Sequence, residues 1–494
     1  MSNMNRRSFL KKSALIVSGA SVFAISGTSA SGQILGANDR VQLALSGAGS
    51  RGGELINFFR AVPNVEIAYI VDADGTRAET RVSEIATATG RTPKGTQDFR
   101  AMLDDKNIDA VAISSPNHWH SLQAIWACQA GKDVYVEKPC SHNVFEGRKL
   151  VEAAAKYNRL VQHGTQRRSE DRAAEAIAAA KSGKYGKLIA TKVYASRPRN
   201  PLGFKPIEAP PTNINWNQWL GPAPMQPYHG NLVPYNWHWF WDTGNGEIGN
   251  NGPHLFDLCI WALGERNPNS VISCGCRFVR DPANHYRDQA ETATIQFALY
   301  DFDGIPLIFE LCNIAGPRES WGAREEAEFY TENGVIREMT KYSNDYWFFP
   351  NGGGERQRLD VEFERPSPGG PFGNFVNSVR NRHSVKLNAP IEKGVYTAAV
   401  AHWGNAAYRT GYRETLAAIR EKMGDNTILQ ESIDHVVANL KVVFGDTVKI
   451  DDIPFQVSDK LAIDGEKEKF VNSPLGNSLL TRHPRAPFAV PEQV

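Results

Sequence analysis

The chain has 494 residues, which exceeds the size of one compact core and suits two domains with additional segments. Hydrophobic residues make up 41% and charged residues 22%, as in ordinary globular proteins. Because 55 basic residues nearly balance 54 acidic ones, the net charge of +1 argues against a nucleic acid or an anionic surface as partner and favours a small molecule.

Residues 1–37 are expected to form an export signal and linker outside the fold. A charged start containing Arg6 and Arg7 precedes an apolar middle and a small-residue end at Ala30. This is signal-peptide architecture, too short and too rich in Ser and Gly for a stable transmembrane helix. The paired arginines followed by Ser-Phe-Leu-Lys resemble the twin-arginine signal, which exports folded proteins. Cleavage near Ala30 predicts a periplasmic protein with no remaining membrane segment.

The cysteines show no metal-binding or disulfide pattern, because no Cys-x-x-Cys and no His-Cys ligand spacing occurs. We interpret all six as reduced, partly buried thiols. They are Cys128, Cys140, Cys259, Cys274, Cys276 and Cys312. No metal is expected at His118, His120 or His254 either, since no carboxylate-histidine set at ligand spacing accompanies them.

The first element of the fold is an apolar strand over residues 41–46, which runs directly into GAGSRGG. Gly47, Gly49 and Gly52 match G-x-G-x-x-G, in which the glycines allow a tight turn, close approach to a pyrophosphate and close helix–strand packing. Residues 54–62 continue with helical apolar spacing, so free N–H groups at a helix start would meet the phosphates. We expect Ser50 and Arg51 in this loop to contact a dinucleotide.

A second strand over residues 65–74 carries Asp72 near its end, twenty residues after Gly52. An acid there accepts hydrogen bonds from a ribose 2′-hydroxyl and repels a 2′-phosphate, which favours NAD over NADP. Apolar runs then alternate with helical segments. This alternation predicts an α/β fold whose first domain, residues 38–165, is a Rossmann domain with a doubly wound parallel sheet.

Ligands of such sheets lie at the carboxyl ends of the strands. Lys and Glu are almost never fully buried without partners, so the end of VYVEKP at residues 134–139 predicts a cofactor crevice there. The residues expected at such strand ends to contact cofactor are Pro116, Asn117, His118, Glu137, Lys138 and Gln166.

Residues 166–440 are predicted to form a second α/β domain, and residues 441–494 a C-terminal extension. Several consecutive strands with period-two alternation, one pair joined by an Asn-Gly turn, indicate an antiparallel or mixed sheet with one face free to pack on another surface. The region from about residue 385 is expected to be helical. The turn-rich tail is interpreted as an arm to a neighbouring subunit.

A long insertion follows the first strand of this domain, and residues 216–241 hold five of the eleven tryptophans. Two interpretations stay open: the indoles pack a long loop onto the domain, or they form an aromatic platform for a polyhydroxylated ligand. The substrate contacts predicted around this platform are Arg168, Arg197, His238, Trp241, Asp242 and Asn250.

The stretch GNNGPHLFD reads as a loop that enters a helix, with His254 and Asp257 three residues apart on one helical face. A single histidine on an apolar helix is often a hydrogen-bonded core residue. The preceding Gly and Asn residues and Pro253 instead place His254 at a helix start, where a role in an active site is plausible.

Together, GAGSRGG, SSPNHWH, GKDVYVEKP and GNNGPHLFD resemble the Gfo/Idh/MocA oxidoreductase family from about Val41 to residue 340. The resemblance implies a Rossmann domain, an α/β domain with an open, mostly antiparallel sheet, and NAD(P) between them. It also implies homo-oligomers assembled through the sheet face. By this resemblance Lys138 orients the substrate hydroxyl and nicotinamide, and His254 acts as acid/base.

The activity implied by the resemblance is NAD-dependent oxidation or reduction of a secondary hydroxyl in a sugar, sugar derivative or cyclitol. Many family dehydrogenases have aspartate where this chain has Asn250, and an amide cannot accept a proton. An NAD-dependent glycoside hydrolase or lyase acting through a transient keto-sugar is therefore an alternative, and a non-catalytic sugar-binding protein is another. Because free NAD is scarce outside the cytoplasm, we expect an exported enzyme to hold its cofactor tightly.

Overall fold

The structure is a computed structural model that describes residues 40–279, 288–314, 324–339, 345–382, 384–445, 448–483 and 485–494. The predicted export signal and linker, residues 1–37, lie outside the described residues. Among the residues that are described, no helix has both the length and the apolar character needed to span a membrane.

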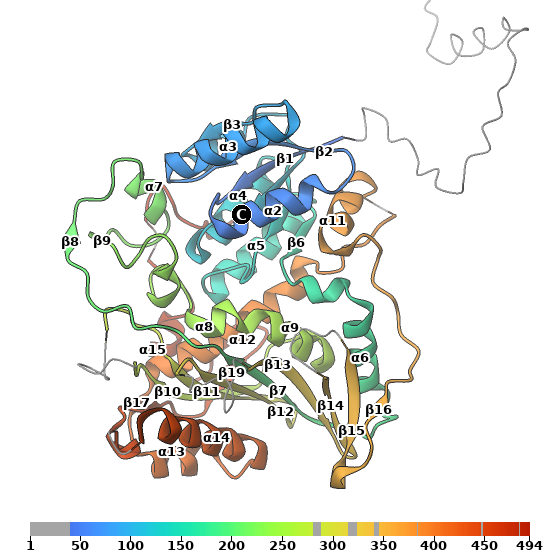
Figure 1. Cartoon of the computed structure of the whole chain (residues 1–494), viewed down its shortest axis with the longest axis vertical. Helices are drawn as coiled ribbons and strands as arrows, with labels where there is room; N and C mark the ends of the chain where they lie inside the picture. Colours follow the sequence, from blue (N-terminus) through green and yellow to red (C-terminus); the bar gives the residue numbers. More distant parts are fainter. Residues whose placement is uncertain are drawn as a thin grey trace, which may run out of the picture. The chain divides into compact units, whose positions relative to one another are not determined.

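The first domain contains a six-stranded parallel sheet with strand order β3-β2-β1-β4-β5-β6 (Figure 1). Its strands are β1 (Val41–Ser46), β2 (Val65–Val71), β3 (Lys94–Thr96), β4 (Ala110–Ile113), β5 (Asp133–Val136) and β6 (Val161–His163). Its helices are α2 (Ser50–Arg60), α3 (Gly75–Thr89), α4 (Asn117–Gln129) and α5 (Val144–Lys156). The central strands β4 and β5 are buried along their whole length, as expected for a parallel sheet covered on both faces. The predicted Rossmann fold is confirmed.

The second sheet has twelve strands, and its main path is β16-β15-β14-β13-β7-β12-β11-β10-β18-β17. Its strands are β7 (Leu188–Ser196), β10 (Ser270–Cys276), β11 (Ile295–Phe302), β12 (Ile305–Cys312), β13 (Arg324–Thr331), β14 (Gly334–Glu338), β15 (Tyr346–Pro350), β16 (Gln357–Arg358), β17 (Tyr412–Arg413), β18 (Gln456–Val457), β19 (Leu461–Asp464) and β20 (Lys469–Phe470). Neighbours pair antiparallel except β7 with β12. The predicted mostly antiparallel sheet is confirmed.

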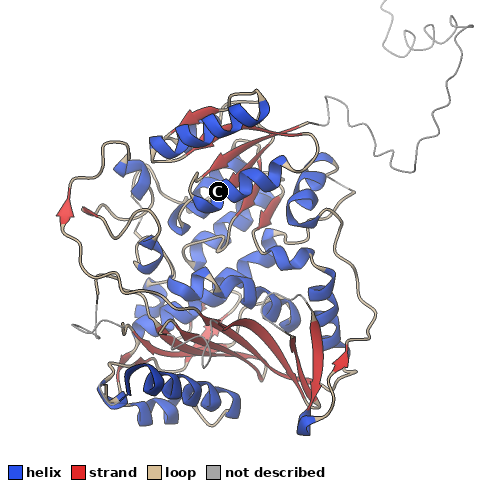
Figure 2. Ribbon diagram, viewed as in Figure 1, coloured by secondary structure: helices blue, strands red, loops and turns tan. Residues whose placement is uncertain are grey.

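A layer of helices separates the two sheets (Figures 1 and 2). It contains α8 (Gly246–Asn250), α9 (Gly252–Leu263) and α12 (Ile391–Thr410), and α6 (Asp171–Ser182) lies beside it. Between Gly394 and Tyr408 the helix α12 is mostly apolar or small on all sides because it contacts both domains: Ala398 packs in a core of the first and Trp403 in the core of the second. A helix that is apolar all round is stable only when it is buried all round.

The outer face of the large sheet is covered by α13 (Leu416–Met423) and α14 (Thr427–Phe444), which Figure 1 shows below the sheet. Leu429, Ile433, Val436 and Leu440 recur at helical spacing and pack in one cluster with residues of β10, β11 and β12. The surface that packs on this part of the sheet face is therefore supplied by the chain's own helices. A homo-oligomer stays a prediction.

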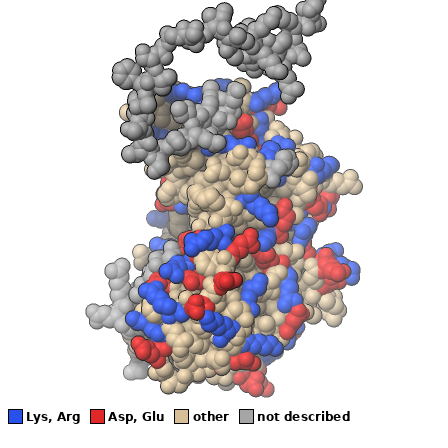
Figure 3. Space-filling model, turned by 90° about the vertical axis from the view of Figure 1, so that its right-hand side faces the viewer, with Lys and Arg blue, Asp and Glu red and all other residues tan. Residues whose placement is uncertain are grey.

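Two further segments return to the first domain. The helix α11 (Gly370–Arg380) places Phe375 in a core cluster with Phe59 and Tyr135. After α15 (Pro474–Ser478) the chain runs back to α4, and Val494 packs in the other core of the first domain. Residues Val41–Val494 form one compact unit as a result. Figure 3 shows acidic and basic side chains intermixed on the face presented, in line with the near-zero net charge.

The packing of α14 predicts that Leu429→Ala destabilises the protein while Val442→Ala on the same helix does not. Leu429 is fully buried and Val442 is 55% exposed. A cavity at Leu429 is expected to lower the free energy of unfolding by about 3 kcal/mol, and the Val442 change by less than about 0.5 kcal/mol. Urea unfolding monitored by circular dichroism checks this, and equal effects of both variants would contradict the assigned packing.

Candidate functional site

The glycine-rich turn joins β1 to α2 at the carboxyl edge of the first sheet. Gly47 has φ +90°, and its N–H donates to the Val71 carbonyl of β2 at 2.8 Å. The helix α2 begins at Ser50 after Gly49, and no side chain caps its first N–H groups. Uncapped N–H groups at a helix start favour an anion.

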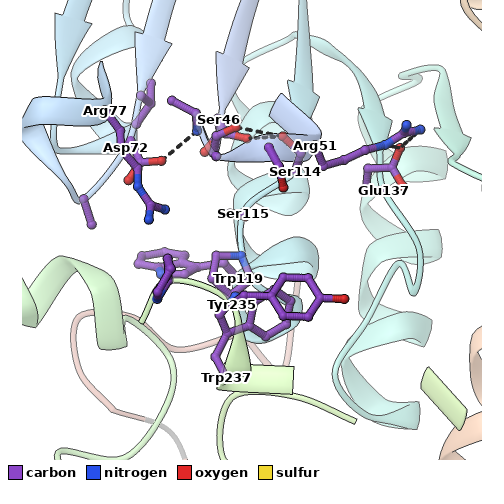
Figure 4. Close-up of a pocket in the computed structure, with 18 of the residues that line it drawn as sticks. Ser46, Arg51, Asp72, Arg77, Ser114, Ser115, Trp119, Glu137, Tyr235 and Trp237 are labelled. Atoms are coloured by element: carbon purple, nitrogen blue, oxygen red, sulfur yellow. Dashed lines mark hydrogen bonds and ion pairs between the residues drawn. The ribbon is translucent and has the colours of Figure 1, made fainter. Parts of the chain in front are cut away.

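Asp72 follows β2 at the same edge (Figure 4). One carboxylate oxygen accepts from the Ala48 N–H at 2.7 Å and the other from the Asp74 N–H at 2.9 Å. Burial raises the pKa of Asp72, and these two hydrogen bonds oppose that shift. Each carboxylate oxygen has a second lone pair, so the group can still accept hydrogen bonds from a ligand.

Glu137, at the end of β5, is held by an arginine from the turn. Arg51 donates to the same Glu137 oxygen from Nε at 2.8 Å and from a terminal nitrogen at 2.7 Å, a contact visible in Figure 4. Gln166 lies next to the pair, with its amide nitrogen 3.3 Å from the Tyr135 hydroxyl and 3.4 Å from Glu137. The carboxylate is thus neutralised within the first domain.

Lys138, the next residue, crosses to the second domain. Its Nζ donates to the backbone carbonyl of Asn250 at 2.7 Å and to the Asn250 side-chain oxygen at 3.1 Å. Burial lowers the pKa of Lys138, and the carboxylates of Glu137 and Glu247 partly oppose this. Glu247 is itself paired with Arg199 at 2.9 Å and accepts from Asn250 at 3.2 Å. The ammonium group is therefore fixed between the domains.

The glycine-rich turn, Asp72, Glu137, Lys138 and Asn250 line one cavity of about 880 Å³ between the domains. The predicted residues that line it are Gly47, Gly49, Ser50, Arg51, Asp72, Pro116, Asn117, Glu137, Lys138, Arg197, His238 and Asn250. Seven predicted residues are not among its lining residues: Gly52, His118, Gln166, Arg168, Trp241, Asp242 and His254. Gly52 and Gln166 directly support lining groups, whereas the other five need separate descriptions.

His118 holds the two domains together instead of lining the cavity. Its Nδ1 lies 3.1 Å from the Thr243 carbonyl and its Nε2 lies 2.9 Å from the Trp219 carbonyl. Two carbonyl partners favour an imidazolium, but burial is the larger effect and lowers the pKa of His118 to about 3. The cofactor contact predicted for this residue stays a prediction, and the structure turns its ring toward the carbonyls of Thr243 and Trp219.

Arg168 also does not line the cavity, because its guanidinium pairs with two carboxylates of the second domain. It is 2% exposed, and its guanidinium donates to Asp257 at 2.8 Å and to Glu265 at 2.6 Å. It therefore fixes α9. The substrate contact predicted for Arg168 stays a prediction. Its pairing with Asp257, 89 residues away in sequence, is indicated by no local pattern.

Trp241 and Asp242 lie away from the cavity lining. Trp241 packs near Tyr408, with the Arg409 guanidinium 4.9 Å from its ring centroid, and Asp242 is exposed. The packing interpretation therefore holds for Trp241. Among the other indoles of the insertion, Trp219 and Trp237 line the cavity, as the platform interpretation proposed.

Burial and the charge of the Lys138 ammonium group lower the pKa of two imidazoles, those of His254 and His238. His254 is partly exposed at the third residue of α9, and burial together with the Lys138 charge holds its pKa well below 6.5. His238 lines the cavity, stacks on Trp237 at 3.5 Å between ring centroids, and has its Nδ1 2.7 Å from the Tyr235 carbonyl. Because a carbonyl only accepts, Nδ1 carries the proton and Nε2 of the neutral ring is an acceptor. Burial lowers the pKa of His238 to about 3.

Several lining residues were not predicted. Trp119 and Tyr235 form part of the lower wall in Figure 4, opposite Asp72 and Ser46. Arg77 lines the cavity beside Asp72, and Gln97 and Gln218 line it as well. The SSPNHWH motif that pointed to Asn117 and His118 contains Trp119, so the aromatic signal was present. Nothing local indicates that Gln218 belongs to the site.

The described residues contain no group of three or more His, Cys, Asp or Glu side chains arranged to hold a metal ion. All six cysteines are buried and free, as the interpretation of unpaired thiols requires. Burial raises the pKa of each thiol, for Cys140 to about 12, so these thiols remain protonated at neutral pH.

Curated relatives match only part of the chain. A glycosyl hydrolase family 109 protein 2 from Shewanella sp. (strain ANA-3) is 30% identical over 171 residues, 31% of this chain. A glycosyl hydrolase family 109 protein from Saccharopolyspora erythraea is 29% identical over 173 residues. The aligned part spans 38% of the length of each of these two relatives.

Solved structures share the fold across both domains. The WlbA dehydrogenase from Bordetella pertussis, in complex with NADH and UDP-GlcNAcA, has a TM-score of 0.55 and 17% identity, and the match covers 75% of this chain and 97% of that one. The UDP-N-acetylglucosamine 3-dehydrogenase GnnA from Acidithiobacillus ferrooxidans has a TM-score of 0.51 and 15% identity, with 75% and 98% covered.

Two family models match the chain. Residues 41–165 match the oxidoreductase family with an NAD-binding Rossmann fold, and residues 202–304 match the C-terminal alpha/beta domain of the same family. The matches fall on the two sides of the cavity that Lys138 and Asn250 bridge. Residues 41–165 and residues 202–304 are thus each similar to a domain of the Gfo/Idh/MocA oxidoreductase family.

Proposed function

We propose that this chain is an exported oxidoreductase that holds NAD tightly and oxidises or reduces a secondary hydroxyl of a sugar, sugar derivative or cyclitol. The observation that carries the proposal is the partly buried Lys138 ammonium, which Asn250 holds in the wall of the cavity that the glycine-rich turn also lines. A cation held at such a position stabilises an alkoxide as it forms.

The turn fits a nicotinamide dinucleotide. A Cβ at Gly52 would lie 1.8 Å from the Gly47 carbonyl oxygen, so this position admits only glycine. A Cβ at Gly49 would lie 3.6 Å from Arg77 and meet nothing nearer, so space for a pyrophosphate exists beside the backbone there. Gly49, Ser50 and Arg51 would hold the phosphates, and Asp72 the adenosine ribose. When bound, NAD supplies the oxidant, because its nicotinamide takes up the hydride of the carbinol carbon.

The choice of NAD over NADP rests on Asp72. Its carboxylate would repel a 2′-phosphate, and each oxygen keeps a lone pair for a ribose hydroxyl. Arg77 lines the same part of the cavity and would favour a phosphate there, but its charge is shared with Asp74, whose carboxylate is 3.4 Å from Arg77 Nε. Two carboxylates around one guanidinium favour the hydroxyl form of the ribose.

The chain's own groups handle the substrate proton. Lys138 orients the hydroxyl and stabilises the developing negative charge, while a neutral imidazole accepts the proton. His254 is our first candidate for the base, because the family resemblance assigns it this role and burial together with the Lys138 charge lowers its pKa. The Nε2 acceptor of His238 in the cavity wall is the second candidate. Asn250 can hydrogen-bond a substrate hydroxyl but cannot take its proton.

An NAD-dependent glycoside hydrolase or lyase is the second candidate function. The curated relatives named as glycosyl hydrolase family 109 proteins favour it, as does Asn250 in a position where many family dehydrogenases have aspartate. In that reaction bound NAD would take up a hydride from the sugar and later return it. Release of the aglycone and addition of one water would then occur without net redox change. Tight retention of the nucleotide suits both reactions.

Export by the twin-arginine route is part of the proposal and rests on the sequence of residues 1–37. Cell fractionation after substitution of both Arg6 and Arg7 by Lys tests it. Loss of the periplasmic pool supports the twin-arginine route, and an unchanged periplasmic pool contradicts it.

The fit of the turn predicts opposite behaviour for two alanine substitutions. Gly52→Ala is expected to destabilise the protein by about 3 kcal/mol, because the Cβ meets backbone that cannot move. Gly49→Ala is expected to fold with nearly unchanged stability and to bind NAD at least about tenfold more weakly, because its Cβ occupies the pyrophosphate approach. Thermal unfolding and titration calorimetry check the pair. Full NAD affinity in Gly49→Ala would contradict the proposal that the glycine-rich turn binds the pyrophosphate.

The lowered pKa values predict the pH profile of kcat/KM. A neutral imidazole base with a pKa far below 6.5 keeps its acceptor as the pH falls, so no loss of activity is expected near pH 6.5. Lys138 must stay charged, and its lowered pKa places the alkaline loss of activity below pH 10.5. His254→Asn and His238→Asn identify the base, since the variant that lacks it is expected to lose at least about a hundredfold in kcat.

If neither imidazole variant loses activity, the assigned base is wrong. A Lys138→Ala variant that retains full activity would remove the main support for an enzyme and favour a non-catalytic sugar-binding protein.

The function itself is tested by incubating the purified protein with a panel of free sugars and glycosides. Free keto-sugar with bound NADH absorbance at 340 nm is the expected result for an oxidoreductase. Released aglycone without net NADH would instead establish the glycosidase, and neither product with bound sugar would contradict both. Protein purified without any extractable nucleotide would contradict tight retention.

A further inference from the structure

The C-terminal arm, residues 482–483 and 485–494, runs over the first domain. Its first anchor is Arg482, which donates to the His118 carbonyl at 2.7 Å and pairs with Glu146 at 2.5 Å. Its last residue, Val494, is buried in the core and its carbonyl accepts from Lys156 of α5. The C label in Figure 1 marks this end over α4. The tail thus docks on its own chain. Its contact with a neighbouring subunit stays a prediction.

Between these anchors the arm forms hydrogen bonds with α7 (Trp216–Leu220), a short helix of the insertion. Arg485 donates from Nε to the Gly221 carbonyl at 2.6 Å and from a terminal nitrogen to the Asn217 carbonyl at 3.0 Å. Its other terminal nitrogen donates to the Asn217 side chain at 2.7 Å. One guanidinium therefore satisfies carbonyls at the end of α7, where a cation is favoured.

Phe488 supports the neighbouring wall. It is 1% exposed and meets the ring of Trp119 edge-on, with 5.4 Å between centroids. The Trp119 indole N–H in turn donates to the carbonyls of Gln218 and Trp219 in α7, at 3.0 and 3.1 Å. Arm, Trp119 and α7 form a continuous set of contacts.

These contacts connect the C-terminal arm to the cavity, because Trp119, Gln218 and Trp219 all line it. The α7 segment also closes onto the edge where Asp72 lies: the Asn215 N–H donates to the Ala73 carbonyl at 2.8 Å. A helix of five residues has no stability of its own, so its position depends on such contacts.

We propose that the C-terminal arm is a strap that positions α7 and Trp119 over the cleft and so sets how slowly the nucleotide leaves. This inference rests on the proposed function, since it assumes a nucleotide in the cleft. Arg485 and Phe488 are positioning residues: neither lines the cavity, and both act through residues that do. Other contacts to α7, such as that of His118 with the Trp219 carbonyl at 2.9 Å, remain without the arm. Loss of the strap should therefore accelerate release and leave the cleft intact.

The test uses the full mature protein loaded with NADH. Excess NAD is added in a stopped-flow instrument, and the decay of bound NADH fluorescence gives the dissociation rate for wild type, Arg485→Ala and Phe488→Ala. We expect both variants to release NADH at least about tenfold faster, the change that follows when one well-made contact is lost. With saturating NAD, kcat is expected to stay within about twofold, because the groups around Lys138 are untouched.

Glu492→Ala is the matched control, since Glu492 is an exposed residue of the same arm, and its release rate is expected to equal that of wild type. Arg485→Lys keeps the charge but not the forked donor, and we expect an intermediate rate. If Phe488→Ala does not fold, Arg485→Ala decides the question, because Arg485 is partly exposed.

Wild-type release rates in both Arg485→Ala and Phe488→Ala would overturn the strap while leaving the proposed function intact. A wild-type protein that binds no NADH would overturn the proposed function and the strap together. A kcat that falls in parallel with the faster release would also overturn the assignment, because it would show that the arm shapes the reacting groups themselves.

Discussion

The arrangement depends on one desolvated ammonium group shared by two domains. Lys138 follows strand β5 of the first sheet, but both hydrogen bonds of its ammonium group go to Asn250 of the second domain. A buried lysine is costly unless its charge is partnered, so separating the domains would leave both residues without these bonds. Asn250 carries no charge, and the nearest carboxylates, Glu137 and Glu247, already have arginine partners. The ammonium is held firmly without being neutralised, which is the condition for it to stabilise a negative charge on a ligand.

The same burial that lowers the pKa of Lys138 keeps the surrounding imidazoles neutral. His118, His163 and His238 each have a pKa lowered to about 3 by burial. Protonation of these rings in the unfolded chain starts near pH 6.5, whereas the folded protein resists it until about pH 3. The folded state is therefore progressively destabilised as the pH falls through that interval, because the unfolded chain binds more protons. A site with one fixed cation and neutral bases suits proton removal from a hydroxyl.

Several segments outside the two sheets cover apolar surfaces of the sheets and of α4. The helices α13 and α14 cover the outer face of the large sheet, α12 fills the space between the sheets, and the C-terminal arm covers α4. Each covers apolar surface that would otherwise face water, a gain of roughly 25 cal/mol for each Å² buried. The insertion adds α7 and the Trp237–His238 stack to the cleft. A cleft with walls from three segments distant in sequence is consistent with a nucleotide that stays bound.

The sequence by itself determined the first sheet, the glycine turn, Asp72 and the Glu137–Lys138 pair. These follow from local order, because every strand of a parallel sheet ends at the same edge and the residues after each strand must meet there. Tertiary structure alone decided the roles of Arg168, His118 and the arm. Arg168 meets Asp257 across 89 residues, and Arg485 meets Gly221 across 264. Such pairings produce no repeating pattern in the sequence, since either partner alone looks like any other polar residue. Only the folded chain shows which charged groups already have a partner.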